Sequence, residues 1–252
     1  MSKDMYLMNQ RFTSSVEDDE FHDYAQAGFE EILSSFVAAD MQLYHSRMTD
    51  EPVPLRAIMQ NATTDNPQFA TLRQVLARMG TGLQCGNYIK NHEGWWLIPY
   101  LPGYNGIYEK AFLWYCNYML RFVSPLTGKE VCYPATTENG TRYNSGERDR
   151  EKMRIGTSQY IVYIPHNEET ILLDHGSRFI LDFHPYNPTA FRVTQMDSTS
   201  FAYGGGDDPV RLLRMTLIED EFNDRTDDAQ NNIANARPYG NAAEADGSTM
   251  FG

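Results

Sequence analysis

Apolar and polar positions alternate along the run KAFLWYCNYMLRF, residues 110–122, in which ten of thirteen residues are apolar or aromatic. At period two, one face of this run is wholly apolar and consists of Phe112, Trp114, Cys116, Tyr118, Leu120 and Phe122. Such alternation, together with a high aromatic content, is typical of a strand that packs on a core. Because a usual strand has only about five or six residues, we expect a long strand that is bent or bulged.

The same period of two continues from Gly86 to the end of the folded chain. NYIKNHEGWWLIPYL, residues 87–101, predicts a hairpin that turns near Glu93-Gly94, and Asn139-Gly140 is a strong local signal for another hairpin turn. SQYIVYIP and TILLD around HNEE predict a further hairpin. The segments SRFILD, AFRVTQMDSTSFAY and VRLLRMTLIEDEF predict the remaining strands. Short strands in this number favour barrels or sandwiches.

The N-terminal third has a helical pattern instead. Residues 14–45 predict a helix whose apolar stripe consists of Phe21, Tyr24, Phe29, Ile32, Leu33 and Phe36. NPQFATLRQVLARMG, residues 66–80, predicts a second helix that ends at Gly80. Its stripe consists of Phe69, Leu72, Leu76 and Met79.

These patterns predict a mainly β fold with an N-terminal helical arm and two small β-barrel or β-sandwich units. We expect the helical arm over residues 1–85, the first β unit over 86–155 and the second over 156–222. Residues 223–252 are polar and small, which predicts a flexible tail.

The net charge of −13 is concentrated near the two ends of the chain. Residues 1–40 carry nine acids and two bases, and residues 219–252 carry eight acids and two bases, so the residues between are neutral overall. An acidic protein does not bind nucleic acid by neutralising phosphates, which requires clustered Lys and Arg. The terminal segments are either solvated and disordered, or they become ordered on a partner.

The lack of a secretory signal and the pattern of cysteines predict a protein that folds in a reducing compartment. The N-terminus MSKDMYLMNQ lacks the features of a secretory signal, and the chain has no apolar run long enough to span a membrane. The three cysteines, Cys85, Cys116 and Cys132, lack the spacing of metal ligands. We expect free thiols that pack as small apolar groups, although Cys116 and Cys132 could face each other across neighbouring strands.

The sequence contains few candidates for catalysis. Asp174 beside His175, and Asp182 two residues before His184, have the chemistry of metal ligands, but turn residues at strand ends explain them equally well. Cys132 could act as a nucleophile with a histidine, whereas no serine lies in a G-x-S-x-G motif. We therefore expect no catalytic residue, no metal and no cofactor.

The segments GWWLIPY, IYEKAFLWYCNYMLRF and ENGTRYNSGERD, followed by SQYIVYIPHNEETILL and LLRMTLIEDEFN, resemble a family of virion neck proteins of tailed bacteriophages of Gram-positive hosts. In that family a Trp-Leu-Ile strand precedes a strand with Cys-Asn-Tyr, an apolar pair and an aromatic residue. Cys116, Asn117, Tyr118, Leu120 and Phe122 occupy these places here. The resemblance covers roughly residues 86–236, and its motifs are structural.

The resemblance implies a head-closure or stopper protein of the virion. Such proteins form a ring of six or twelve copies, contact the portal or adaptor and the tail proteins, and surround a channel through which DNA passes without specific binding. Net negative charge around a channel would repel the DNA backbone. Another virion component, such as a collar, decoration or tail-completion protein, and a phage-encoded hydrolase are the alternatives.

Two sets of residues are candidates for contacts with other subunits. Tyr104 and Asn105 lie in a loop, residues 102–106, and residues 204–209 form a second candidate loop. A basic cluster could dock an acidic neighbouring segment, or it could be a solvated linker, and consists of Arg148, Arg150, Lys152 and Arg154.

Overall fold

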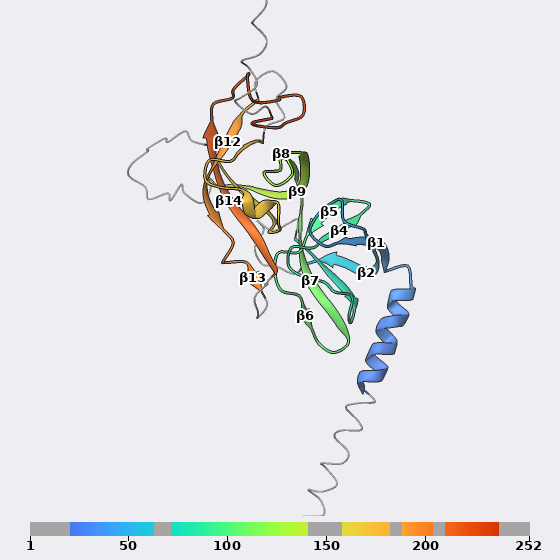
Figure 1. Cartoon of the computed structure of the whole chain (residues 1–252). Helices are drawn as coiled ribbons and strands as arrows, with labels where there is room; N and C mark the ends of the chain where they lie inside the picture. Colours follow the sequence, from blue (N-terminus) through green and yellow to red (C-terminus); the bar gives the residue numbers. More distant parts are fainter. Residues whose placement is uncertain (1–20, 63–71, 141–157, 182–187, 204–209, 237–252) are drawn as a thin grey trace, which may run out of the picture. The chain divides into compact units, whose positions relative to one another are not determined.

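The computed structural model describes residues 21–62, 72–140, 158–181, 188–203 and 210–236, and these residues form mainly β-strands (Figure 1). Internal contacts divide the chain into two units, with the boundary between Tyr115 and Cys116 and with the short segment Ser46–Asp50 grouped in the second unit. Each unit has its own hydrophobic core. The prediction of two small β units is confirmed as two barrel-like sheets, but the chain does not divide at residues 155 and 156.

The first unit is a closed antiparallel barrel. Its strands are β1 (Ala39–Tyr44), β2 (Val53–Asn61), β3 (Arg73–Arg78), β4 (Tyr88–Asn91), β5 (Gly94–Leu97), β6 (Gly103–Tyr104) and β7 (Tyr108–Tyr115). They follow the order β3-β2-β1-β4-β5-β7-β6, and β3 also pairs with β7, which closes the sheet on itself. Apolar side chains fill the interior, including Leu43, Ile89 and Leu113.

The β4–β5 hairpin is stabilised by the side chain of Asn91. Its oxygen accepts hydrogen bonds from the backbone N–H groups of Glu93 and Gly94, at 2.9 and 3.1 Å, and from the indole Nε1 of Trp96 at 3.2 Å. Gly94 has a φ of 137°, a backbone angle that residues other than glycine rarely adopt. The hairpin predicted over residues 87–101 is therefore confirmed.

Residues 21–34 are helical, and this helix packs on the outer side of the first barrel. Phe29 and Leu33 are buried against side chains that include Ile58, whose neighbour Ala57 faces the barrel core. The Arg78 guanidinium donates to both carboxylate oxygens of Glu30, at 2.7 Å from Nε and 2.6 Å from Nη2.

Arg56 on β2 stabilises the C-terminal end of this helix. Its Nε donates to the carbonyl of Leu33 at 2.6 Å, and its Nη2 donates to the carbonyl of Ser35 at 3.0 Å. The last carbonyls of a helix have no partner within the helix, so these bonds satisfy two of them. The helix is thus held on the barrel by apolar burial at one face and by arginine side chains at its flank and end.

The second unit is a six-stranded antiparallel sheet with one additional short strand. Its elements are β8 (Tyr118–Val123), β9 (Glu130–Asn139), β10 (Gln159–Pro165), the 3-10 helix η2 (Thr170–Leu172), β11 (Arg178–Ile180), β12 (Ala190–Asp197), β13 (Ala202–Tyr203) and β14 (Val210–Asp220). The sheet follows the order β11-β12-β14-β10-β9-β8, with β13 paired to β14. The terminal strands β8 and β11 approach each other, and the Tyr118 hydroxyl donates to the carbonyl of Ile180 at 2.8 Å.

The apolar run over residues 110–122 forms two strands in different units. β7 ends at Tyr115 and β8 begins at Tyr118, so Cys116 and Asn117 separate them. The Asn117 side chain is bonded to Thr137 of β9, because its oxygen accepts from the Thr137 N–H at 2.7 Å and its amide donates to the Thr137 carbonyl at 2.9 Å. The expected bend is therefore a break between two units.

The buried face changes across this break. In β7 the odd-numbered residues Ala111 and Leu113 face the barrel core, while Phe112 is 38% exposed. In β8 the even-numbered residues fill the second core, and they are Tyr118, Leu120 and Phe122. The expected apolar face is correct for β8 and wrong for β7. In β7 the predicted face points away from the barrel core, and there Trp114 is buried beneath Tyr100 while Phe112 stays partly exposed.

The predicted helical arm over residues 1–85 is wrong for three segments that the structure describes as strands. β1, β2 and β3 lie within this range. The helix-like spacing in residues 66–80 misled the assignment, because Val75 and Ala77 face the barrel core and β3 pairs with both β2 and β7. Pairing on both edges outweighs the helical propensity of a short segment.

Two predicted hairpins also differ from the observed connections. Asn139 pairs with Tyr160 across β9 and β10, so the chain makes no tight turn at Asn139-Gly140; the connecting residues 141–157 lie outside the described residues. The segment 170–174 is not a strand, because η2 occupies Thr170–Leu172 and Leu173 is buried in the second core.

The predicted flexible tail over residues 223–252 is wrong where the structure describes it, at 223–236. Asp228 and Ile233 form an antiparallel bridge, with backbone bonds of 2.8 and 3.0 Å. Ile233 and Ala234 are buried. This segment is therefore part of the second unit, while residues 237–252 lie outside the described part of the chain.

Candidate interaction surfaces

The helix over residues 21–34 has a second apolar face that is exposed. Phe21 and Ile32 are eleven residues apart, close to three full helical turns, and Tyr24 lies beside them on the same side. Their exposed fractions are 69%, 81% and 46% for Phe21, Tyr24 and Ile32, and Phe36, just beyond the helix, is 97% exposed. We call these four residues the helix stripe. Exposed apolar groups gathered in this way make the stripe a candidate interaction surface.

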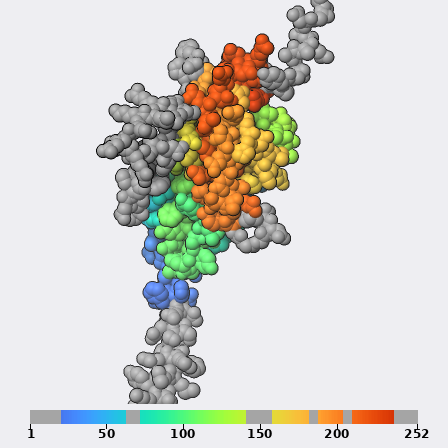
Figure 2. Space-filling model, turned by 90° about the vertical axis from the view of Figure 1, so that its left-hand side faces the viewer, coloured from blue at the N-terminus to red at the C-terminus, as the bar shows by residue number. Residues whose placement is uncertain are grey.

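A second exposed apolar surface lies on the outer side of β7 and on the loop before β6. Tyr100, Leu101 and Phe112 are 39%, 61% and 38% exposed, and we call them the aromatic patch. The Tyr100 ring contacts the rings of Phe112 and Trp114, with centroids 6.5 and 5.5 Å apart, so that Trp114 is buried beneath it. Figure 2, in which β6 and β7 are green, shows this part of the first unit at the surface.

The aromatic patch has a positive charge at its edge. The Lys110 ammonium lies 5.8 Å from the centre of the Phe112 ring, a distance at which the cation is attracted to the ring face. Lys110 and Phe112 are two residues apart on β7 and therefore lie on the same side of the strand.

The structure places two of the predicted contact residues. Tyr104 is 78% exposed, but it pairs with Glu109 and so faces the opposite side of β7 from Phe112. The Asn105 side-chain oxygen accepts from the N–H groups of Ile107 and Tyr108, each at 3.1 Å, which makes Asn105 a turn residue. The basic cluster Arg148, Arg150, Lys152 and Arg154 and the loop 204–209 lie outside the described residues.

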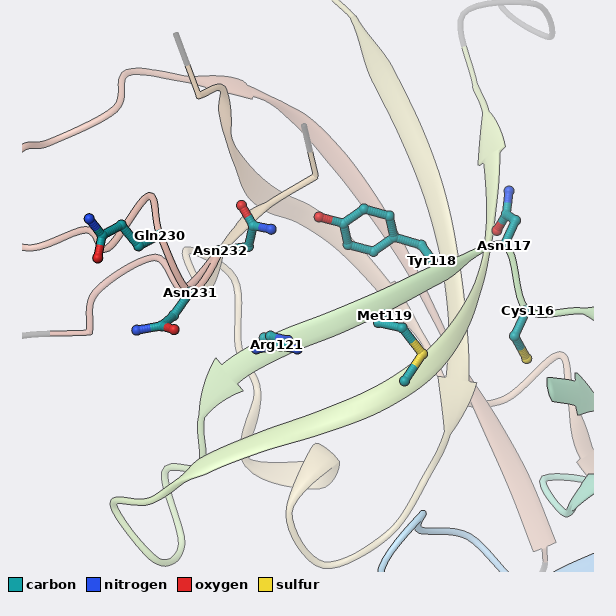
Figure 3. A pocket seen from close by; sticks show the side chains of 8 residues that line it. All are labelled: Cys116, Asn117, Tyr118, Met119, Arg121, Gln230, Asn231 and Asn232. Atoms are coloured by element: carbon teal, nitrogen blue, oxygen red, sulfur yellow. The ribbon is translucent and has the colours of Figure 1, made fainter. Parts of the chain in front are cut away.

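A polar pocket of about 340 Å³ lies in the second unit beside β8 (Figure 3). Its described lining consists of Cys116, Asn117, Tyr118, Met119, Arg121, Gln230, Asn231 and Asn232. Sites for small molecules are mostly apolar with a few polar groups, whereas this lining is rich in amides. None of the described lining residues is a carboxylate or a histidine, the commonest general acids and bases, so the lining offers mainly amide hydrogen bonds and one guanidinium.

Arg178 on β11 binds the C-terminal segment to the second sheet. Its Nε donates to Asp220 Oδ2 at 2.8 Å, and its Nη1 donates to Asp227 Oδ1 at 2.9 Å and to Asn235 Oδ1 at 3.0 Å. The Arg178 side chain is 14% exposed and the Asp227 side chain is fully buried. We call Arg178, Asp220, Asp227 and Asn235 the Arg178 cluster.

The ionisation of Asp227 reflects this cluster. Burial alone raises the pKa of a carboxyl group, but here the N–H groups of Asn235 and Asn223 and the Arg178 guanidinium outweigh it, and the pKa of Asp227 is lowered. The carboxylate is thus kept charged in a buried position, which joins residues 223–236 to β11 and β14.

A second buried polar group lies where β9 meets the segment before η2. The Tyr133 hydroxyl donates to Glu169 Oε2 at 2.5 Å and accepts from the Asn167 amide at 3.0 Å. Burial and then the Glu169 carboxylate raise the pKa of Tyr133. A neutral phenol that bonds a buried carboxylate has a structural role here, because it holds the Asn167–Thr170 turn on the sheet.

The residues considered for chemistry do not come together in the structure. Burial raises the pKa of the Cys85 thiol to about 12, and it also raises the pKa values of Cys116 and Cys132. The nucleophilic thiolate form is therefore disfavoured at all three cysteines. None of the three cysteines forms a disulfide. Cys132 pairs in register with Arg121, so it does not face Cys116.

The candidate metal residues are placed in part. Within the described residues there is no group of three or more His, Cys, Asp or Glu side chains that could hold a metal ion. Asp174 Oδ1 accepts from the Ser177 hydroxyl at 2.9 Å, which fits a turn residue, while Asp182 and His184 lie outside the described ranges.

Comparisons with known proteins give little guidance. No protein-family model and no curated protein matches this chain. One solved structure that matches weakly is described as "MrkH, A novel c-di-GMP dependence transcription regulatory factor", with 8% sequence identity and a TM-score of 0.23 over 79% of this chain and 83% of that chain. A likeness this weak carries no argument about fold or function. Among the residues described, no helix is both long and apolar enough to cross a membrane.

Sequence reasoning missed both the helix stripe and the aromatic patch. It assigned Phe21, Tyr24, Ile32 and Phe36 to one buried stripe together with Phe29 and Leu33. The spacing does contain a signal, because Phe29 and Leu33 lie about a quarter turn or more away from Phe21 around the helix. It also missed the Arg178 cluster, whose members are separated by up to 57 positions in the chain.

Proposed function

We propose that this protein is a structural component of a tailed-phage virion that forms a ring at the junction between head and tail. In this role it joins the portal or adaptor to the tail proteins and helps to retain DNA. Two separately cored β units with exposed apolar surfaces on the first unit support the proposal, because a subunit of an assembly needs rigid bodies and surfaces for neighbouring chains.

The charge distribution is compatible with this role. The chain has a net charge of −13, with the excess acid near its two ends. A channel surrounded by negative charge repels the phosphate backbone, so DNA could pass without adhering. The resemblance of residues 86–236 to phage neck proteins is the reason for choosing the head–tail junction over other virion positions.

Electron microscopy of the phage particles that carry this protein tests the proposal. Gold-labelled antibody against the chain is expected at the neck, and density that fits the two β units is expected as a ring there. Label on the head shell or at the tail tip would indicate a decoration or tail-tip protein instead. Absence of the chain from purified particles would exclude a virion role.

Deletion of the gene gives a second test with a distinct readout. We expect filled heads that lose DNA and lack attached tails, and we expect the wild-type gene supplied on a plasmid to restore intact particles. Normal tailed particles in the deletion strain would contradict head closure, whatever other function the chain has.

A further inference from the structure

We propose that the helix stripe of one copy docks on the aromatic patch of a second copy. The inference deepens the proposed ring, because it names the two surfaces of the subunit contact, but the contact can be measured on the isolated chain. It starts from two different exposed apolar surfaces on one unit: Phe21, Tyr24, Ile32 and Phe36 on one, and Tyr100, Leu101 and Phe112 on the other.

The size of the helix stripe fits one side of a specific interface. An aromatic side chain has about 150–250 Å² of surface, so Phe21, Tyr24 and Phe36, at 69%, 81% and 97% exposure, together expose on the order of 500 Å². A stable interface of standard size buries about 800 Å² per partner. The stripe therefore supplies most of the apolar part of such a contact, and the flanking polar residues can supply the rim.

Both surfaces are held in place before any contact forms. The helix is fixed by the burial of Phe29 and Leu33 and by the bidentate ion pair between Arg78 and Glu30. In the aromatic patch, Phe112 lies on β7, a strand with partners on both sides, and the loop residue Tyr100 is packed against Trp114. Rigid surfaces lose little conformational entropy when they associate, so their apolar area contributes more fully to affinity.

Charge favours the aromatic patch of a second copy over the helix of a second copy. Within residues 21–36 the chain has three acids, Asp23, Glu30 and Glu31, and no lysine or arginine. Glu31 lies about 20° from Tyr24 around the helix and so flanks the stripe. Two helices that packed stripe to stripe in parallel would bring Glu31 close to its own copy, which is unfavourable. The aromatic patch instead presents Lys110 at its edge, so docking there pairs unlike charges.

A contact between two different surfaces leaves one of each free on every dimer. Such a head-to-tail contact adds further copies until the rotation closes a ring. A contact between identical surfaces would stop at a dimer. The proposed docking therefore yields a chain or ring of subunits, in agreement with the ring proposed above.

Two variants of the full-length chain separate these possibilities. Phe21→Ala with Tyr24→Ala removes the N-terminal half of the helix stripe, and Leu101→Ala with Phe112→Ala removes most of the aromatic patch. Phe21 and Tyr24 are largely exposed, so the helix variant should keep the thermal unfolding of the wild type. Phe112 is partly buried against Tyr100, so the patch variant should unfold a few degrees below the wild type and remain folded in the assay. Ile171→Ala with Leu172→Ala is the matched control, because these exposed apolar residues lie in the second unit.

Sedimentation velocity over a wide range of protein concentration gives the readout. The wild type and the control are expected to associate into species larger than dimers as concentration rises. Each interface variant alone should associate about a hundredfold more weakly, or more weakly still, because two aromatic or large apolar anchors are lost. A mixture of the two variants should form a 1:1 dimer and nothing larger, because only one complete pair of surfaces remains.

Several outcomes would overturn the inference. A wild type that stays monomeric at every concentration excludes the contact, and a mixture that forms no dimer excludes pairing between these two surfaces. If only the helix variant loses association, the helix binds some other surface of the copy. If the chain is found at the neck but never self-associates, this inference alone is overturned. If the two variants form the mixed dimer but the chain is absent from virions, only the proposed function is overturned.

Discussion

The first unit closes through backbone pairing, whereas the second unit ends in two strands, β8 and β11, that the described residues do not join by strand pairing. In the first unit β3 and β7 pair over six residues. In the second unit the gap between the terminal strands is spanned by the hydrogen bond from Tyr118 to Ile180 and by the edge-to-face contact of Phe122 with Phe179.

This difference shows two ways to complete a small β unit. Backbone pairing depends little on which side chains are present. The outer side of β7 in the first barrel can therefore carry partly exposed aromatic residues without weakening the closure. The second unit depends on individual side chains, and it also holds residues 223–236 through the Arg178 cluster. We therefore expect single polar substitutions to affect the second unit more strongly than the first.

The largest effect is expected from Arg178→Ala. It leaves the fully buried Asp227 side chain without its charged partner, and breaking a buried ion pair in this way costs about 3–5 kcal/mol. Urea unfolding should show the second unit destabilised, and hydrogen exchange should show lost protection over residues 223–236. Arg192→Ala, which alters the exposed residue opposite Arg178 in register, is the control and should change stability by less than about 0.5 kcal/mol. Equal effects of the two would contradict a role for the cluster.

Trp114→Ala tests the outer packing of the first unit. Because Trp114 is buried beneath Tyr100, we expect a loss of about 3 kcal/mol, at the lower end of the range for removing a core aromatic. Phe112→Ala, on the same side of β7 but 38% exposed, should cost about 1 kcal/mol. Thermal unfolding of both variants measures this difference. If Trp114→Ala left unfolding unchanged, the burial described for β7 would be wrong.

The smallest effect is expected from Tyr118→Phe. It removes one hydroxyl and leaves the Ile180 carbonyl without a donor at the gap of the second unit, so the cost should be about 1 kcal/mol. The comparison is Tyr44→Phe in the first unit, where the hydroxyl donates to the side chain of the exposed residue Gln42 at 3.0 Å and water can replace it. Urea midpoints that fell equally in both variants would show that the hydroxyl does not help to close the second sheet.

The strands from Gly86 onward could be predicted because their alternation is local and strong. The hairpin over residues 87–101 and the strands β12 and β14 lie within the segments that the sequence indicated. β3 was assigned to a helix because six residues give too short a pattern to separate period two from period 3.6. Its partners β2 and β7 decide its conformation, and a local pattern contains no information about them.

The candidate surfaces were only partly predictable. The sequence identified the aromatic residues of the helix and Phe112 and Trp114 of β7, but it assigned all of these to the interior. Which aromatic side chain is buried depends on the covering groups, as Tyr100 covers Trp114 and leaves Phe112 partly exposed. The Arg178 cluster could not be predicted at all, because its ion pairs join residues 42 and 49 positions apart.

The sequence by itself determined that the chain is mainly β, that its acid lies near its two ends, and that apolar side chains alternate along residues 110–122. These properties follow from local periodicity and composition, which need no knowledge of distant residues. The tertiary structure alone decided that this run divides between two units, that its buried face changes at Cys116 and Asn117, and that residues 223–236 are packed. Each of those outcomes depends on contacts between segments far apart in the chain, such as Asn117 with Thr137 and Arg178 with Asp227.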